Sequence, residues 1–375
     1  MSNYDIAAII WPSYSGDDPR AHIFWPEGYG EWQSVKAMPD KGYEGCRWPR
    51  KPLWGYVNEA NSDVMEMQIN TAVRHGVNTF IYDWYWYDNR PFLENCLNDG
   101  FLKAGNNKLM KFYLMWANHN ATYLWDIRNS HDEKTVVWKG AVTEKIFDEI
   151  CDRTIEKYFM QENYYQIDGC PVYMIFDISN FVQSFPSVQA CREGVKRFRE
   201  KTVAAGFKGL HLQLAFFHND HSAFTNPETG ERFLYRELME YLGFDSFTNY
   251  NWNCVPLNID QDYRLVTDEY MAFCEDYRTW DTPFYPNITI GWDNNIRFKG
   301  FKPGVTRNNT PEAFEEACER IRKHADSLLA QGKTAAPLIT VNSWNEWTET
   351  SYLEPDDLYG YGYLEAVKKV FGESK

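Results

Sequence analysis

The chain of 375 residues lacks most of the short motifs that identify a common enzyme chemistry. No glycine-rich phosphate loop follows its first strand-like run, no Ser stands in a GxSxG setting, and neither HExxH nor CxxC occurs. These absences argue against a dinucleotide-binding sheet, a serine hydrolase and the usual zinc sites. His218 and His221 have no third ligand at useful spacing, so we expect neither a metal nor a cofactor.

Long apolar runs and excess positive charge are missing as well. No apolar run reaches about 18 residues, so we expect no insertion into a membrane. The formal net charge is −15, which argues against nucleic acid as a partner because phosphate backbones select basic patches. The eight cysteines are scattered, as buried thiols in a reducing compartment would be. Residues 5–10 are too short for a signal peptide, so the sequence predicts a cytoplasmic protein unless a leader has been trimmed.

Aromatic residues, by contrast, are abundant. The chain has 15 Trp, 25 Tyr and 24 Phe, which is more than a core alone usually takes. Surplus Trp and Tyr often line carbohydrate sites, although protein interfaces use them too.

Strand-like and helical patterns alternate along the whole chain. Helical patterns cover about 144–160, 187–205, 231–242, 262–280, 310–331 and 360–371. Such alternation predicts an α/β fold, a (β/α)8 TIM barrel with long βα loops at its C-terminal face, in one domain spanning 1–375. The first βα loop, at about 12–61, is unusually long. A doubly wound open sheet is the alternative. The eight strand-like runs are 5–11, 78–86, 111–117, 171–177, 210–216, 244–250, 285–292 and 338–344.

Polar and aromatic residues collect where these strands end, which is where barrel enzymes place their active sites. Aromatic rings can cover the apolar faces of sugars, amides can bind hydroxyls and carboxylates can move protons, so the pattern predicts an oligo- or polysaccharide site. The residues at these ends are Trp11, Ser13, Tyr14, Asp83, Trp84, Tyr85, Trp86, Trp116, Asn118, His119, Asp177, His218, Tyr250, Trp252, Trp292, Asp293, Asn342, Trp344, Asn345 and, further along the last loop, Tyr352.

Glu346 and Glu349 are the candidates for catalysis. They follow the last strand and lie three residues apart, so one helical turn would direct both to the same side. Two neighbouring carboxyls push their pKa values apart, leaving one as acid and one as base. A salt bridge or a capping role is the structural alternative, and Asp83 or Asp177 could supply a carboxylate instead.

Several segments of the chain share a pattern with a known group. They are 31–39, 63–86, 114–118, 290–297, and Asn342-Ser-Trp-Asn-Glu-Trp-Thr-Glu349 with 352–355. Together they resemble the glycoside hydrolase family 99-like proteins, including the WbsX-type proteins encoded in bacterial polysaccharide loci. The resemblance implies a (β/α)8 barrel and hydrolysis of α-mannoside-type linkages with retention.

The resemblance also implies roles for the two glutamates. Glu346 would deprotonate the 2-hydroxyl of the sugar, which attacks the anomeric carbon to give a 1,2-anhydro sugar, and Glu349 would act as general acid and then base. Where many relatives have a Glu after Trp-Ala-Asn, this chain has His119, which points to a different or an acidic sugar. The alternatives are a glycosyltransferase or transglycosylase, for which we find no basic cluster suited to a nucleotide sugar, and a non-catalytic carbohydrate-binding barrel.

Overall fold

The computed structural model describes residues 4–38, 41–43, 46–48, 50–217, 222–227 and 229–372, so His218 and His221 lie outside the described residues. Its central sheet is parallel, in the order β14-β11-β10-β6-β4-β1-β16-β15. All eight predicted strands are present. They are β1 (Asp5–Ile10), β4 (Thr79–Tyr87), β6 (Lys111–Trp116), β10 (Cys170–Ile175), β11 (His211–Ala215), β14 (Ser246–Thr248), β15 (Asn287–Thr289) and β16 (Leu338–Asn342).

The sheet closes on itself between its two outermost strands. A parallel bridge joins Phe247 of β14 to Phe284, just before β15. Phe247 donates its N–H to the Pro283 carbonyl at 2.9 Å, and Tyr285 donates to the Phe247 carbonyl at 2.9 Å. Closure confirms the predicted (β/α)8 barrel and excludes the open doubly wound sheet.

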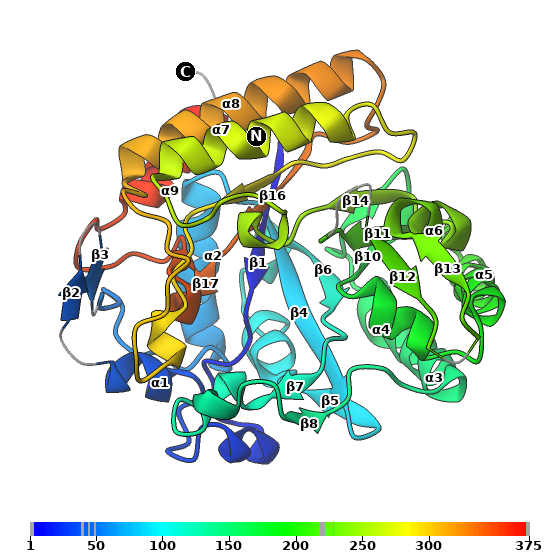
Figure 1. The fold of residues 1–375 in the computed structure, drawn as a ribbon, viewed down its shortest axis with the longest axis horizontal. Helices are drawn as coiled ribbons and strands as arrows, with labels where there is room; N and C mark the ends of the chain where they lie inside the picture. The colour runs from blue at the N-terminus through cyan, green and yellow to red at the C-terminus, as the bar shows by residue number, and fades with distance from the viewer. Residues whose placement is uncertain are drawn as a thin grey trace.

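Helices surround this barrel (Figure 1). Side chains of Asn61, Thr143, Ser187 and Thr310 accept backbone N–H bonds at their first turns. No described helix is both long and apolar enough to cross a membrane. The helices are α1 (Trp32–Ala37), α2 (Ser62–Arg74), α3 (Glu144–Thr154), α4 (Ile178–Gln183), α5 (Val188–Ala204), α6 (Tyr235–Leu242), α7 (Tyr263–Tyr277), α8 (Pro311–Ala330) and α9 (Gly362–Phe371).

Two predicted helices differ from the structure at their ends. The helix expected at 231–242 begins only at Tyr235, because β13 (Arg232–Leu234) pairs with β12 (Ala223–Thr225) in a hairpin. The helix expected at 144–160 changes to a π-helical turn at Ile155–Phe159. In both places pairing or packing with neighbouring segments prevails over local helix propensity.

The segment between β1 and α2 forms a small apolar cluster of its own over the C-terminal ends of the strands. Trp11 packs against Trp125, with ring centroids 5.1 Å apart, and Trp32 packs against Trp347 at 5.8 Å. The cluster therefore joins the first loop to the loops after β6 and β16. The lower part of Figure 1 shows α1, β5 (Arg90–Phe92), β7 (Ala121–Thr122) and β8 (Val136–Trp138) gathered at this end. The interpretation of 1–375 as one domain stays a prediction.

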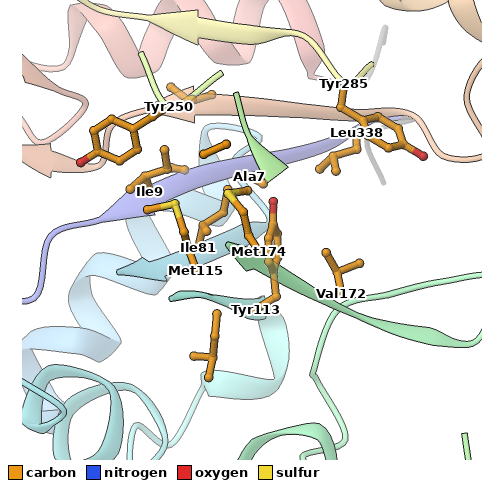
Figure 2. Packing of buried hydrophobic residues seen from close by; sticks show 14 of the residues in the cluster. Ala7, Ile9, Ile81, Tyr113, Met115, Val172, Met174, Tyr250, Tyr285 and Leu338 are labelled. Carbon is orange, nitrogen blue, oxygen red and sulfur yellow. The ribbon is translucent and has the colours of Figure 1, made fainter. Parts of the chain in front are cut away.

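The barrel interior is filled by alternate residues of each strand. Figure 2 shows side chains such as Ala7, Ile81, Met115 and Met174 directed toward one another between the strands. Each of these four is fully buried. Because successive side chains of a strand point to opposite faces, the residues that continue the same alternation at each C-terminal end also face the barrel axis.

We expect Ile81→Ala to lower the free energy of unfolding by about 2–5 kcal/mol, because it leaves a cavity in the packed interior. The matched control is Leu109→Ala, whose side chain is 59% exposed and should lose less than about 0.5 kcal/mol. Urea denaturation of the two variants measures the difference. Equal losses would contradict the interior packing described here.

Candidate active site

The guanidinium of Arg297 lies at the centre of three carboxylates. It donates to Glu349 Oε1 at 2.6 Å, to Glu31 Oε1 at 3.1 Å and to Glu346 Oε2 at 3.4 Å. All four side chains are at least nine-tenths buried. A buried charge without a partner is strongly destabilising, so these four residues, the Arg297 cluster, depend on one another.

Glu31 reaches the cluster from the long first loop, at the start of α1. Its second oxygen, Oε2, accepts the indole N–H of Trp11 at 2.5 Å. Trp11 follows directly after β1. The first loop therefore contributes a carboxylate to the site and is tied to the barrel through it.

Glu346 is held by its neighbours in the loop after β16. Its backbone N–H donates to Ser343 Oγ at 2.8 Å, and this hydroxyl donates to the Ser351 carbonyl at 2.6 Å. The Asn345 side chain accepts the Trp11 N–H at 2.8 Å and donates to the Trp11 carbonyl at 2.9 Å. These bonds fix the backbone that leads into Glu346.

Glu349 precedes a residue in a left-handed conformation. Thr350 has φ of 54°, which is costly for a β-branched residue and persists only where neighbours enforce it. Its hydroxyl donates to the Asp293 carbonyl at 3.0 Å, and Asp293 donates its N–H to the Glu349 carbonyl at 2.8 Å. A Cβ at Gly291 would lie 3.0 Å from the Thr350 carbonyl. The loops after β15 and β16 thus fix each other.

A cavity of about 180 Å³ opens beside the Arg297 cluster, and we call it the central cavity. It is smaller than the roughly 300–1,000 Å³ of pockets for drug-sized ligands, so it suits one ring-sized group. Its walls combine aromatic rings with carboxylates. The lining residues are Trp11, Asp83, Tyr85, His119, Leu124, Trp125, Phe176, Tyr250, Arg297, Glu346 and Glu349.

Strand alternation explains much of this lining. Trp11 continues the inward series Ala7 and Ile9, and Asp83 continues from Ile81 (Figure 2). Phe176 continues the inward series of β10 in the same way. Four predicted residues besides the glutamates and Asp83 therefore line the central cavity, and they are Trp11, Tyr85, His119 and Tyr250.

Burial raises the pKa of both glutamates. The pKa of Glu346 lies well above its ordinary range because of burial and then the nearby charge of Glu349, with Arg297 opposing both. Burial also raises the pKa of Glu349, against a stronger opposing contact with Arg297. Two such carboxyls cannot readily both be ionised, so the pair keeps a proton at pH values above the ordinary range of a glutamate.

Asp83 adds a further acidic group across the central cavity. Tyr250 donates its hydroxyl proton at 3.4 Å to Asp83 Oδ2 and 3.3 Å to Glu346 Oε1, which makes two long, shared contacts. Burial, followed by the charge of Glu349, raises the pKa of Asp83 well above its usual range. Asp83 Oδ1 and Glu349 Oε2 are buried and have no hydrogen-bond partner among the described residues. Such atoms require a partner, which a bound ligand can supply.

His119 lies in the cavity wall as a neutral ring. Burial, with the positive charge of Arg297 as a smaller cause, lowers the pKa of His119 to about 4. Its Nδ1 lies 3.0 Å from the Asn120 carbonyl. A carbonyl accepts, so Nδ1 carries the proton, and Nε2 is left as an acceptor.

A second pair of buried carboxylates lies behind the site. Gln68 donates its amide to Glu59 at 3.1 Å and to Glu354 at 2.8 Å. Asn345 donates to both oxygens of Glu59, at 3.1 and 2.9 Å, and Trp347 donates to Glu354 at 2.6 Å. Asn345 and Trp347 flank Glu346, so this pair supports the backbone of the catalytic candidate.

Several other predicted site residues lie outside the central cavity, on the opposite alternation of their strands. Trp84 donates to Glu94 at 2.8 Å, Trp86 packs on Trp84, and Trp116 packs on Phe147 of α3. Their indoles fill the space between strands and helices.

Asn118, Asp177, Tyr14 and Tyr352 have partners that give them structural roles. Asn118 exchanges two bonds with the Asp177 backbone, at 2.7 and 2.8 Å, and the Asp177 carboxylate caps α4. The Tyr14 hydroxyl accepts the Trp347 N–H at 3.2 Å, and Tyr352 stacks on the Trp347 ring at 3.8 Å. These residues build the loops around the cavity.

The remaining predicted residues are also absent from the cavity lining. Trp252 stacks on two Tyr of α7, and Trp344 donates to Gln68 at 3.1 Å. Trp292 is partly buried, and its carbonyl accepts a bond from the loop that follows. The Asn342 carbonyl accepts two bonds, while its buried side-chain amide has no partner among the described residues.

The comparison with sequence families gives the class of the protein. The family model described as glycosyltransferase WbsX matches residues 7–367. The chain therefore belongs to this family, as its motifs predicted.

Two kinds of known protein are similar to the chain. Protein WxcX of Xanthomonas campestris pv. campestris, described as uncharacterized, is 24% identical over 364 residues, covering 94% of this chain and 47% of WxcX. The chain thus spans about half the length of the curated relatives it matches. A GH99 endo-alpha-mannosidase from Bacteroides thetaiotaomicron has a TM-score of 0.56 at 11% identity, covering 98% and 96% of the two chains. A "glycoside hydrolase-like protein" also has a TM-score of 0.56, at 14% identity, covering 100% and 95%. These solved structures share the barrel fold.

We expect Arg297→Met to lower the free energy of unfolding by about 3–5 kcal/mol, because three buried carboxylates lose their cation. Arg264→Met is the matched control, since Arg264 pairs with Glu316 at the surface, with both side chains about half exposed. That variant should lose about 1 kcal/mol or less. Thermal unfolding compares them, and similar losses would contradict the dependence of the cluster on Arg297.

The Glu59–Glu354 pair predicts a pH dependence of stability. Burial raises the pKa of Glu59 to about 7 and that of Glu354 well above its ordinary 4.5. Between about pH 4.5 and 7 the folded protein therefore holds a proton on Glu59 that the unfolded chain has released. The stability that Glu59 contributes is fully present below about pH 4.5 and is lost as pH rises through 7, by about 1.4 kcal/mol per pH unit, and Glu354 acts in the same direction. Glu354→Gln removes one such group. The free energy of unfolding of wild type minus that of Glu354→Gln, measured by urea unfolding, should fall as pH rises from 5 to 8, and a constant difference would refute the titration.

Proposed function

We propose that the protein is a retaining glycoside hydrolase that acts on α-linked, mannose-like glycans, with Glu346 and Glu349 as its catalytic pair. The observation that carries the proposal is the pairing of two buried carboxylates on one guanidinium beside a ring-sized cavity with aromatic walls. Trp11 and Trp125 offer flat apolar surfaces for a sugar face. The similarity to endo-alpha-mannosidase structures supports the same class of substrate.

The mechanism uses the sugar's own hydroxyl as nucleophile. Glu346 takes the proton of the 2-hydroxyl, whose oxygen attacks the anomeric carbon, while the glycosidic bond breaks and the leaving oxygen takes a proton from Glu349. Glu349, now ionised, deprotonates a water that opens the 1,2-anhydro ring at the anomeric carbon, and Glu346 returns the proton to the 2-oxygen. Two inversions give net retention.

The contacts of Arg297 favour a different distribution of the proton from the one this reaction requires. Arg297 contacts Glu349 at 2.6 Å and Glu346 at 3.4 Å, which favours the charge on Glu349 and the proton on Glu346. The proposed roles require an ionised Glu346 and a protonated Glu349 when the sugar is bound. Substrate binding must therefore move the proton from Glu346 to Glu349.

Glycosyl fluorides separate the two roles, because fluoride leaves without protonation. We expect Glu349→Gln to lose at least about 10² in kcat on an α-linked disaccharide but to keep most of the first step on the matching α-glycosyl fluoride, measured by fluoride release. Glu346→Gln should lose both reactions, since the nucleophilic hydroxyl is no longer activated. Wild type should give a retained product anomer by NMR.

The opposite pattern of fluoride release would exchange the two roles. Sugar binding without turnover in wild type would instead support a carbohydrate-binding barrel. Glu315→Gln, on the outer helix α8, is the control and should behave as wild type.

The family description favours a second candidate, a glycosyltransferase. A nucleotide-sugar donor brings a negatively charged diphosphate, which needs cations or free backbone N–H groups. Arg297 is the one Lys or Arg in the described lining of the central cavity, and it already contacts three carboxylates. Turnover that requires a nucleotide-sugar donor would establish the transferase and overturn the hydrolase.

A further inference from the structure

A second and larger cavity, of about 410 Å³, lies next to the site, and we call it the outer cavity. Its walls come from β7–β8, α4 and the turn between β12 and β13, on one side of the barrel (Figure 1). The volume is within the roughly 300–1,000 Å³ of ordinary ligand pockets. The side chains that carry the argument are Asn120, Lys139, Asn180, Gln183, Phe185 and Asn226.

The side chains that line the outer cavity differ in charge from those that line the central cavity. Four amides and one ammonium, that of Lys139, lie in its described lining, which contains no carboxylate. The central cavity has three carboxylates in its lining, and the whole chain has a net charge of −15. Amide groups both donate and accept, as the binding of sugar hydroxyls requires, and an ammonium attracts an anionic substituent.

The segments that follow two strands contribute residues to both cavities. After β6, His119 lines the central cavity and its chain neighbour Asn120 lines the outer cavity. After β10, Phe176 lines the central cavity and Asn180 the outer one. Since neighbouring Cα atoms are about 3.8 Å apart, the two cavities lie on either side of the same short segment after β6.

The polar wall of the outer cavity is held in place by the loops behind it. Asn120 Oδ1 accepts the Gly140 N–H at 2.9 Å, which leaves the Nδ2 donor of Asn120 directed elsewhere. A Cβ at Gly140 would lie 2.1 Å from the Asn118 carbonyl, so only glycine permits this approach. The Asn180 amide nitrogen donates to Asp177 at 3.1 Å, which leaves its oxygen as an acceptor.

We propose that the outer cavity binds the sugar unit next to the one in the central cavity, and that Lys139 selects a unit that carries a carboxylate. The substrate would then be an acidic oligo- or polysaccharide bound across at least two units. This inference rests on the proposed function, which assigns one sugar ring of the substrate to the central cavity.

The test measures binding by calorimetry in the Glu349→Gln background, so it does not depend on turnover. The probes are an oligosaccharide containing a uronic acid and the same oligosaccharide with the carboxylate reduced to an alcohol. Adding Lys139→Ala should weaken binding of the acidic probe about two- to fivefold and leave the reduced probe unchanged. Adding Gln183→Ala should weaken both probes. Lys134→Ala, an exposed lysine of the same loop outside both cavities, should weaken neither.

Three results would overturn the inference: equal binding of the two probes to the parent protein, an equal effect of Lys139→Ala and Lys134→Ala, or no binding of either probe. If any of these three results is found and wild type still hydrolyses neutral glycans, the outer-cavity inference is wrong and the proposed hydrolase activity is retained. Charge-selective binding without turnover by wild type would support the outer cavity as a binding site for an acidic sugar and would contradict the proposal that the protein is a hydrolase.

Discussion

The contact of one guanidinium with three buried carboxylates is the constraint on which the site depends. Arg297, Glu31, Glu346 and Glu349 come from three different loops, and none of these charges could remain buried without the others. The contact joins the first loop to the last two, across as many as 266 positions of sequence. It also gives the two glutamates different shares of the positive charge, with the closer contact to Glu349, so the two carboxyls differ in acidity.

The barrel supplies the frame in which this cluster is possible. Its interior is closed by buried side chains below the site (Figure 2), while the same inward alternation delivers Asp83, Phe176 and Tyr250 at the open end. Behind the cluster, Asn345 and Trp347 are tied to the Glu59–Glu354 pair, so the backbone around Glu346 is fixed from both sides. A rigid backbone of this kind holds the reacting groups in position in advance, so no free energy is spent on reorganising them during the reaction.

The sequence predicted the strands and their C-terminal ends well, because apolar runs and their spacing are local signals. It predicted less of the site. The position of a residue at the end of a strand does not show whether its side chain faces the barrel axis or the surrounding helices. Trp84, Trp86 and Trp116 were named as site residues with Asp83, but alternation turns them toward the helices. Tyr85 is two residues after Asp83 on the same strand, so strand alternation predicts that Tyr85, and not these three Trp, faces the cavity with Asp83. Glu31, Leu124, Trp125 and Arg297 follow the strands in the connecting segments, where strand patterns give no signal. Only the shared motif segments 31–39 and 290–297, which contain Glu31 and Arg297, could have singled out those two residues.

The most direct measurement is a crystal structure of Glu349→Gln with an α-linked oligosaccharide bound. We expect one sugar ring in the central cavity, its 2-hydroxyl within hydrogen-bond distance of Glu346 and its glycosidic oxygen facing position 349. A sugar bound only outside the central cavity, with Glu346 still in contact with Arg297 and no sugar hydroxyl, would contradict the account.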